Sequence, residues 1–212
     1  AGHPPRADAH LHGVQGGALS AAGAVPEPTP AALHAFWFGP RPLAARAAWF
    51  RKDPAFDAEV RARFGPVVDA ALAGALPPAW RADRLASILV LDQLTRNVHR
   101  DTPLAFAGDS AALALARALV DAGADRALDP YERAFVYLPF EHAEDLACQR
   151  QAVLLFEALA RSAPGTAEML DYARRHLVVI ERFGRFPHRN AILGRADAPG
   201  EREFLREPGS RF

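Results

Sequence analysis

The 212-residue chain has almost no cysteine and no net charge. Its single cysteine, Cys148, excludes an intrachain disulfide and any zinc site built from several cysteines. Basic and acidic residues number 25 each, so we expect it to bind neither nucleic acid nor an acidic membrane surface. No run approaches the ~20 apolar residues that span a bilayer, and the N-terminus lacks the pattern of a secretory signal. We therefore predict a cytoplasmic protein.

The motifs of several enzyme classes are also missing. There is no glycine-rich loop before Lys-Ser/Thr, no G-x-G-x-x-G after a strand, and no G-x-S-x-G or H-E-x-x-H. His142 and Glu144 match half of a zinc deaminase motif, but its P-C-x-x-C half is absent. We therefore predict no cofactor, and interpret Cys148 as a small buried apolar residue. No feature determines an oligomeric state.

The apolar residues recur at the spacing of amphipathic helices, and no segment alternates like a strand. Half of the residues are apolar and 24% are charged, which is typical of a globular chain. Residues 1–28 are rich in Ala, Gly and Pro and predict a flexible N-terminal extension. Residues 29–212 predict a single all-α domain of seven to eight antiparallel helices joined by short loops.

Helix boundaries follow from capping residues, proline and glycine. Glycine is expected to stop helices at Gly39, Gly123 and Gly184. Proline is expected to kink or divide a helix at Pro66 and to interrupt another at Pro139. The predicted helix starts are Thr29-Pro30, Asp53-Pro54, Asp83, Asp109-Ser110 and Asp129-Pro130.

Three stretches place polar residues where apolar ones are expected. In the first, Asp92 follows an apolar run, with Arg96 and Arg100 four and eight residues later on the same helical face; Gln93 and Asn97 form a second pair. The second stretch supplies three carboxylates and an imidazole: Glu141, His142, Glu144 and Asp145. The third alternates basic side chains with phenylalanines after His176: Arg182, Arg185, His188, Arg189 and Arg195.

These stretches have a functional and a structural interpretation. In the functional one, a ligand carboxylate or phosphate faces Arg96, Arg100, Arg185, His188 and Arg189. His142 and Glu144 would then transfer protons. In the structural one, the arginines pair with Asp92, Glu141, Glu144 and Asp145 and hold the helices in register. A metal site at His142, Glu144, His176 and His188 is a further alternative, although it has no ligand-spacing signature.

The same stretches resemble a bacterial protein family, domain of unknown function 924, over residues 32–206. The resemblance is carried, in order, by Phe36-Trp37-Phe38-Gly39, Trp49-Phe50, Phe56-Asp57, Leu91-Asp92-Gln93 with Arg96-Asn97, Leu138-Pro139-Phe140 with His142 and Glu144, and the block from Arg182 to Asn190. It implies an all-α fold similar to tetratricopeptide-like helical hairpins. The family has no established reaction, so no catalytic role is implied.

We predict a ligand-binding module of tetratricopeptide-like type, with a pocket lined by Arg, His and Glu for a small anionic ligand or a peptide. The alternatives are an enzyme that uses His142 and Glu144 for acid–base chemistry on a phosphorylated or carboxylated metabolite, and a purely structural polar network. The predicted site residues are Asp92, Gln93, Arg96, Asn97, Arg100, His142, Glu144, His176, Arg185, His188, Arg189 and Asn190.

Overall fold

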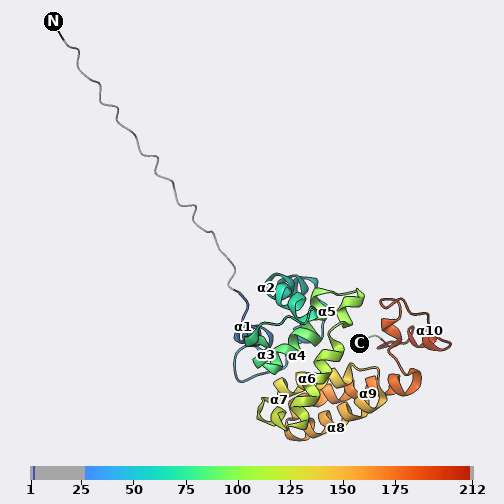
Figure 1. Ribbon diagram of the computed structural model, residues 1–212. Coiled ribbons are helices and arrows are strands. Elements are labelled where there is room, and N and C mark those ends of the chain that lie inside the picture. Colours follow the sequence, from blue (N-terminus) through green and yellow to red (C-terminus); the bar gives the residue numbers. More distant parts are fainter. Residues whose placement is uncertain (1, 3–26, 211–212) are drawn as a thin grey trace.

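The computed structural model describes residues 2 and 27–210, and within them all regular structure is helical (Figure 1). The all-α prediction is confirmed, whereas most of the predicted flexible extension, residues 1–28, lies outside the described residues. The longer helices are α1 (Pro30–Phe38), α2 (Pro54–Leu72), α6 (Asp109–Asp121), α7 (Pro130–Glu141), α8 (Leu146–Ser162) and α9 (Ala167–Phe183). The shorter ones are α3 (Pro78–Ala82), α4 (Arg84–Ile88), α5 (Thr95–Val98) and α10 (Glu201–Phe204).

Capping side chains begin several helices at the predicted positions. Thr29 accepts a hydrogen bond from the amide of Ala32 at 3.1 Å, and Asp53, Asp83 and Asp129 cap α2, α4 and α7 in the same way. α6 also begins at its predicted residue, Asp109, without a side-chain cap bond. The carboxylate of Asp109 forms ion pairs with two arginines instead.

Two prolines lie inside undivided helices. α7 continues through Pro139 to Glu141, so the predicted interruption there is wrong, and α2 continues through Pro66 to Leu72. A proline removes one backbone hydrogen bond and strains the preceding turn. In α7 every residue from Ala134 to Glu141 is buried, so packing on both sides of Pro139 outweighs that loss.

The helix predicted after Asp83 contains a π-helical segment, η2 (Leu89–Leu94), between α4 and α5. The amide of Thr95 donates to the carbonyl of Val90, five residues earlier, and the buried Thr95 hydroxyl donates to the same carbonyl at 2.8 Å. All six residues of η2 are buried, including Asp92 and Gln93. π-helical turns are rare and occur frequently at functional sites.

Gly108 allows α6 to begin directly against η2. A Cβ atom at this position would lie well within 3.0 Å of the carbonyl oxygen of Leu91, closer than real Cβ contacts come. Because Gly108 has no side chain, Asp109 is brought beside the arginine that follows η2, Arg96.

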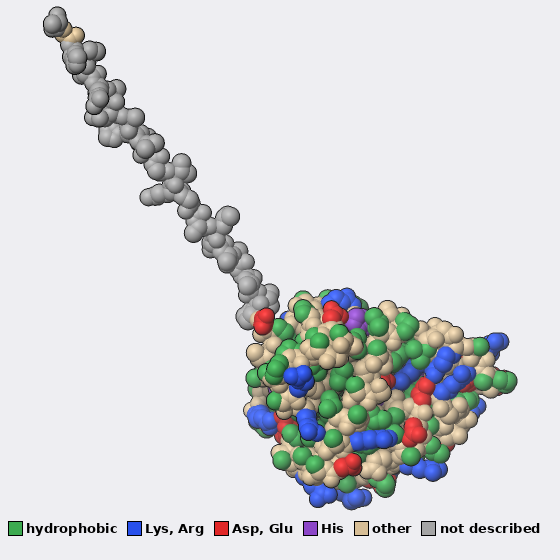
Figure 2. Space-filling model, in the orientation of Figure 1, with side chains coloured by type: hydrophobic (Ala, Val, Ile, Leu, Met, Phe, Trp, Pro, Cys, Tyr) green, Lys and Arg blue, Asp and Glu red, His purple; other side chains and the backbone are tan. Residues whose placement is uncertain are grey.

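The main core is aromatic at its centre. The indole of Trp49 lies 5.0 Å from the ring of Phe135, and Trp37 and Phe38 contact Phe135 edge-on. A second, smaller cluster joins the end of α9 to the segment that follows it: Val179, Ile180, Phe183, Phe186 and Phe204. In Figure 1 this segment, which includes α10, projects beyond the end of α9. In the same orientation, Figure 2 shows basic and acidic side chains next to one another at this end of the molecule.

Among the described residues, one segment has the length and composition to cross a membrane: Pro103–Asp121, which spans the short helix η3 (Pro103–Phe106) and α6. A single such segment is weak evidence for a membrane helix. Asp109, inside it, is paired with Arg96 and Arg189 of the protein interior. These ion pairs hold α6 against the other helices.

Candidate functional site

The fold brings the three polar stretches together in one cluster between η2, the end of α7, α9 and the segment after α9. We call this the polar centre: Asp92, Arg96, Asp109, Glu141, His142, Glu144, His176, His188, Arg189 and Arg195. Three members are not among the predicted site residues: Glu141 and Arg195, which the sequence analysis named only within the polar stretches, and Asp109, which it named only as a helix start. For Asp109 the signal is weakest. Its only sequence signal is a helix start, and aspartate at a helix start is normally explained by capping.

A fully buried carboxylate, Asp92, orients the imidazole of His142. Its Oδ1 lies 2.7 Å from His142 Nδ1 and 3.1 Å from Arg96 Nη1, and Oδ2 accepts a hydrogen bond from Gln93. Burial acts to raise the pKa of Asp92, but the charge of Arg96 and the hydrogen bonds from His142 and Gln93 hold it below its usual range. Asp92 is therefore ionised and accepts the Nδ1 proton of His142.

The other imidazole nitrogen of His142, Nε2, carries no proton when the ring is neutral and can therefore accept one. Burial lowers the pKa of His142 and Arg96 lowers it further, against the opposing charge of Asp92, so the ring is neutral near pH 7. Nε2 forms no hydrogen bond within the described residues and is not among their fully buried unpaired atoms, so it keeps some exposure to solvent. It is thus a proton acceptor that solvent reaches.

Asp109 links two arginines. Its oxygens lie 3.0 Å from Arg96 Nη2 and 3.1 Å from Arg189 Nη1. Arg189 also donates to the carbonyl of His142 at 3.1 Å and packs its guanidinium 4.7 Å above the ring of Phe186. Burial and the neighbouring charge of Arg96 lower the pKa of Arg189 to about 10, which indicates that its positive charge is only partly balanced.

Glu141 and His176 form a buried pair behind His142. Glu141 Oε1 lies 3.1 Å from His176 Nδ1, which also lies 2.9 Å from the carbonyl of Tyr172. Burial raises the pKa of Glu141 well above its usual value, and the charge of Asp92 adds to this. Burial lowers the pKa of His176 well below its usual value. Burial therefore favours the neutral form of both groups.

Glu144 is held by the segment that follows α9. It accepts two hydrogen bonds from Arg195, at 2.6 and 2.9 Å, and one from the amide of Phe186 at 2.7 Å. Burial acts to raise the pKa of Glu144, but these donors lower it. The carboxylate that contacts His142 is therefore Asp92, whereas Glu144 is engaged elsewhere.

Four predicted site residues lie in two separate pairs. Arg100 and Asn97 both bind Asp57 of α2, with the Arg100 contacts at 2.5 and 2.7 Å, because the helix ends at Val98 and Arg100 leaves the face of Asp92. Arg185 and Asn190 both bind Glu201, and the Arg185 bond lowers the pKa of Glu201 to about 2.

The described residues contain no group of three or more His, Cys, Asp or Glu side chains arranged to hold a metal ion. In the alternative metal set, Glu144 binds Arg195, and His176 lies beside the neutral Glu141. Cys148 is buried as predicted, with its sulfur 2.8 Å from Arg117 Nη2, and burial raises the pKa of its thiol. The described chain thus presents an acid–base and guanidinium centre.

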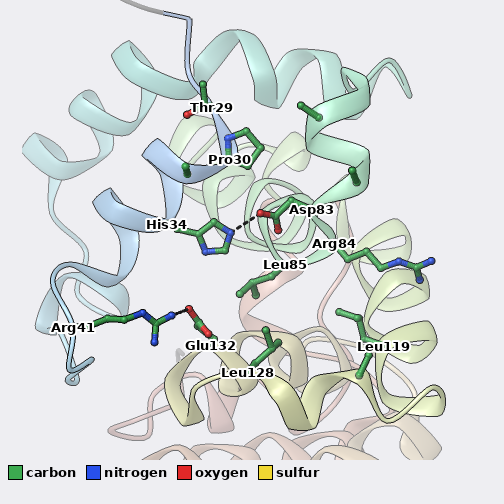
Figure 3. Close-up of a pocket in the computed structure, with 14 residues that line it drawn as sticks. Thr29, Pro30, His34, Arg41, Asp83, Arg84, Leu85, Leu119, Leu128 and Glu132 are labelled. Carbon is green, nitrogen blue, oxygen red and sulfur yellow. Dashed lines mark hydrogen bonds and ion pairs between the residues drawn. The ribbon is translucent and has the colours of Figure 1, made fainter.

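An open groove of about 970 Å³ lies away from the polar centre, between α1, α4, α6 and α7 (Figure 3). Its walls carry two ion pairs, His34 with Asp83 at 2.9 Å and Arg41 with Glu132 at 2.5 Å. Asp83 and Glu132 also cap helices, so both carboxylates have a structural role. None of the predicted site residues lines this groove, and no motif in the sequence indicates it.

Comparison with known proteins shows the family. The model of a bacterial protein family of unknown function, DUF924, matches residues 33–209. A solved structure of a protein of unknown function, ATU0120 from Agrobacterium tumefaciens, is 38% identical, with a TM-score of 0.73, and the match covers 84% of this chain and 96% of that one. A search of curated proteins gave no match. The chain therefore belongs to the bacterial DUF924 family.

Proposed function

We propose that this protein binds a small anionic ligand, through a carboxylate or phosphate group, beside His142, Arg189 and Arg195. The observation that carries the proposal is a pair of unsatisfied donors. The buried Nε atoms of Arg189 and Arg195 meet no acceptor within the described chain. A buried donor left unpaired costs about 1–3 kcal/mol, so an oxygen supplied by a ligand would be stabilised there.

The surroundings of the two arginines favour an anion. Both contact Phe186, Arg189 through its ring and Arg195 through its carbonyl at 3.2 Å, and Arg189 also reaches the carbonyl of His142. The lowered pKa of Arg189, caused by burial and by Arg96, marks a positive potential that an anion would relieve.

Acid–base catalysis is the second candidate function, favoured by the Asp92–His142 pair. A neutral imidazole oriented by a buried carboxylate is a common general base. In this alternative His142 keeps its predicted role, and Asp92 replaces Glu144 as its partner. The substrate would carry the same carboxylate or phosphate group.

The proposal includes the tetratricopeptide-like arrangement and the cytoplasmic location that the sequence predicts. α7, α8 and α9 follow one another through short connections, and α8 packs against both of its neighbours (Figure 1). Helical hairpins stacked in this way are typical of binding modules. The single cysteine supports a reducing compartment.

Thermal unfolding with inorganic phosphate, citrate and a sugar phosphate tests the proposal. An anion at 100 times its dissociation constant should add ~2.7 kcal/mol of stability. We expect Arg195→Gln to lose this shift, and Arg161→Gln, which changes an exposed arginine of α8, to keep it. If no anion shifts the wild type and Arg195→Gln unfolds far below Arg161→Gln, the polar centre is a structural network and the proposal is wrong.

A further inference from the structure

The outer face of the α8–α9 hairpin carries the same three-residue pattern twice. Each helix presents an arginine, an aliphatic residue four positions later and a glutamate three positions after that. Residues at this spacing share one helical face. We call the set the hairpin face: Arg150, Leu154 and Glu157 of α8, and Arg174, Val178 and Glu181 of α9.

Two ion pairs join the helices at the ends of this face. Arg174 lies 3.0 Å from Glu157, and Arg150 lies 3.7 Å from Glu181. The pairs run in opposite chain directions, so α8 and α9 are antiparallel and Leu154 lies opposite Val178 between them. These two aliphatic side chains belong to residues that are 60% and 61% exposed.

The charges of the hairpin face alternate along both directions. On each helix an arginine precedes a glutamate, and across the hairpin each arginine lies beside a glutamate. Two copies of this face can therefore pack against each other about a two-fold axis that lies in the plane of the face. The axis can run parallel to the helices or perpendicular to them. In both cases every arginine of one copy lies opposite a glutamate of the other. This packing also brings the two exposed aliphatic pairs together at the centre. Such a surface is self-complementary.

We propose that the hairpin face is a homodimer interface, on which a second copy of this chain packs through Leu154 and Val178. Each existing ion pair would become part of a four-residue ring of alternating charge. α8 and α9 have 17 residues each. At 1.5 Å per residue they are about 25 Å long, and two helix widths give roughly 500 Å² per copy. Contact areas of this size are typical of weak, reversible dimers.

Sedimentation equilibrium of the full chain tests the proposal. The protein concentration should run from about 5 to about 500 µM, because an interface of this area is expected to form a weak dimer. We expect the wild type to pass from monomer to dimer within this range and Leu154→Lys/Val178→Lys to stay monomeric. The matched control is Leu104→Lys, because Leu104 is 50% exposed on η3, away from the hairpin face. It should dimerise like the wild type. A wild type that is monomeric throughout, or a double variant that still dimerises, overturns the proposal.

A charge-inverted variant distinguishes this specific interface from non-specific association through exposed apolar side chains. The variant Arg150→Glu/Glu157→Arg/Arg174→Glu/Glu181→Arg keeps both ion pairs within the chain and reverses the pattern. It should dimerise with itself and not with the wild type, since like charges then face each other. Native mass spectrometry of a mixture, with one chain carrying a mass tag, measures the heterodimer. Statistical amounts of heterodimer would contradict the proposed packing.

Discussion

At the scale of single residues, Glu141 and His176 illustrate how burial decides the charge of a side chain. Burial shifts both pKa values toward the neutral form: it raises that of Glu141 well above its usual value and lowers that of His176 well below its own. Asp92, a few ångströms from His142, is equally buried but stays ionised, since Arg96 and His142 surround it. Residue type alone does not distinguish these two carboxylates.

The neutral state of Glu141 predicts the effect of pH on stability. Its folded pKa lies above its unfolded one, so the folded state binds more protons between the two values and stability falls as pH rises through that window. Glu141→Gln imitates the protonated form and should remove this loss. Its stability relative to the wild type should increase with pH above about 4.5, by up to ~1.4 kcal/mol per pH unit.

Urea unfolding of Glu141→Gln and the wild type at pH values from 4 to 8 measures this difference. Glu59→Gln is the control, because Glu59 pairs with Arg63 on the surface of α2 and both are well exposed. Its stability difference from the wild type should change little with pH. A Glu141→Gln variant that loses stability as pH rises would mean that the carboxylate is ionised in the folded protein.

At the scale of elements, the π-helical segment η2 depends on a neighbour that is distant in sequence. Periodicity predicts an ordinary helix after Asp83, and the helix does begin there. The wider turn appears where Gly108 and the start of α6 press against the carbonyl of Leu91. The π-helical turn therefore occurs where η2 contacts the start of α6.

Gly108→Ala should destabilise the protein by about 1–3 kcal/mol, as overpacked positions do, because its Cβ meets backbone rather than a flexible side chain. The matched control is Gly65→Ala in α2, where a Cβ would lie 3.8 Å from the Arg61 side chain, an ordinary contact. The higher helix propensity of alanine is offset there by Pro66, which disfavours a Cβ atom on the preceding helical residue, so stability should change by less than about 1 kcal/mol. Chemical denaturation measures both, and equal stabilities for the two variants would contradict the close packing of α6 on η2.

At the scale of the whole molecule, the segment after α9 is docked on the helices by few groups. Glu144 holds Arg195 and the amide of Phe186, and Arg189 binds Asp109 and the carbonyl of His142. The small apolar cluster around Phe186 and Phe204 adds to these contacts. The polar centre therefore lies at a junction between the main core and this segment. Segments fastened by few contacts open locally before the whole protein unfolds.

Glu144→Ala should release this segment. Losing its hydrogen bonds costs about 1–3 kcal/mol, and each 1.4 kcal/mol raises the open population tenfold. Trypsin cleavage at the exposed Arg202 of α10 should become about ten- to hundredfold faster, whereas sites in α2 should be unaffected. Glu59→Ala is the control for a lost surface ion pair. Unchanged cleavage at Arg202 would show that Glu144 does not hold the segment.

The helical class, most helix starts, the glycine stops and most residues of the polar centre could be predicted from the order of amino acids. These features depend on local chemistry: capping side chains, the periodicity of apolar residues and the cost of burying an unpaired charge. Pro139 shows the limit of local rules, since packing around α7 outweighs its missing hydrogen bond.

Which of those residues contact one another is visible only in the folded chain. His142 binds Asp92, 50 residues away, rather than Glu144, two residues away, and Arg100 binds Asp57 rather than Asp92. The groove beside His34 and the hairpin face likewise depend on which helices are neighbours. An ion pair or hydrogen bond acts over only a few ångströms, and the packing of whole helices sets such distances between residues that are remote in the sequence.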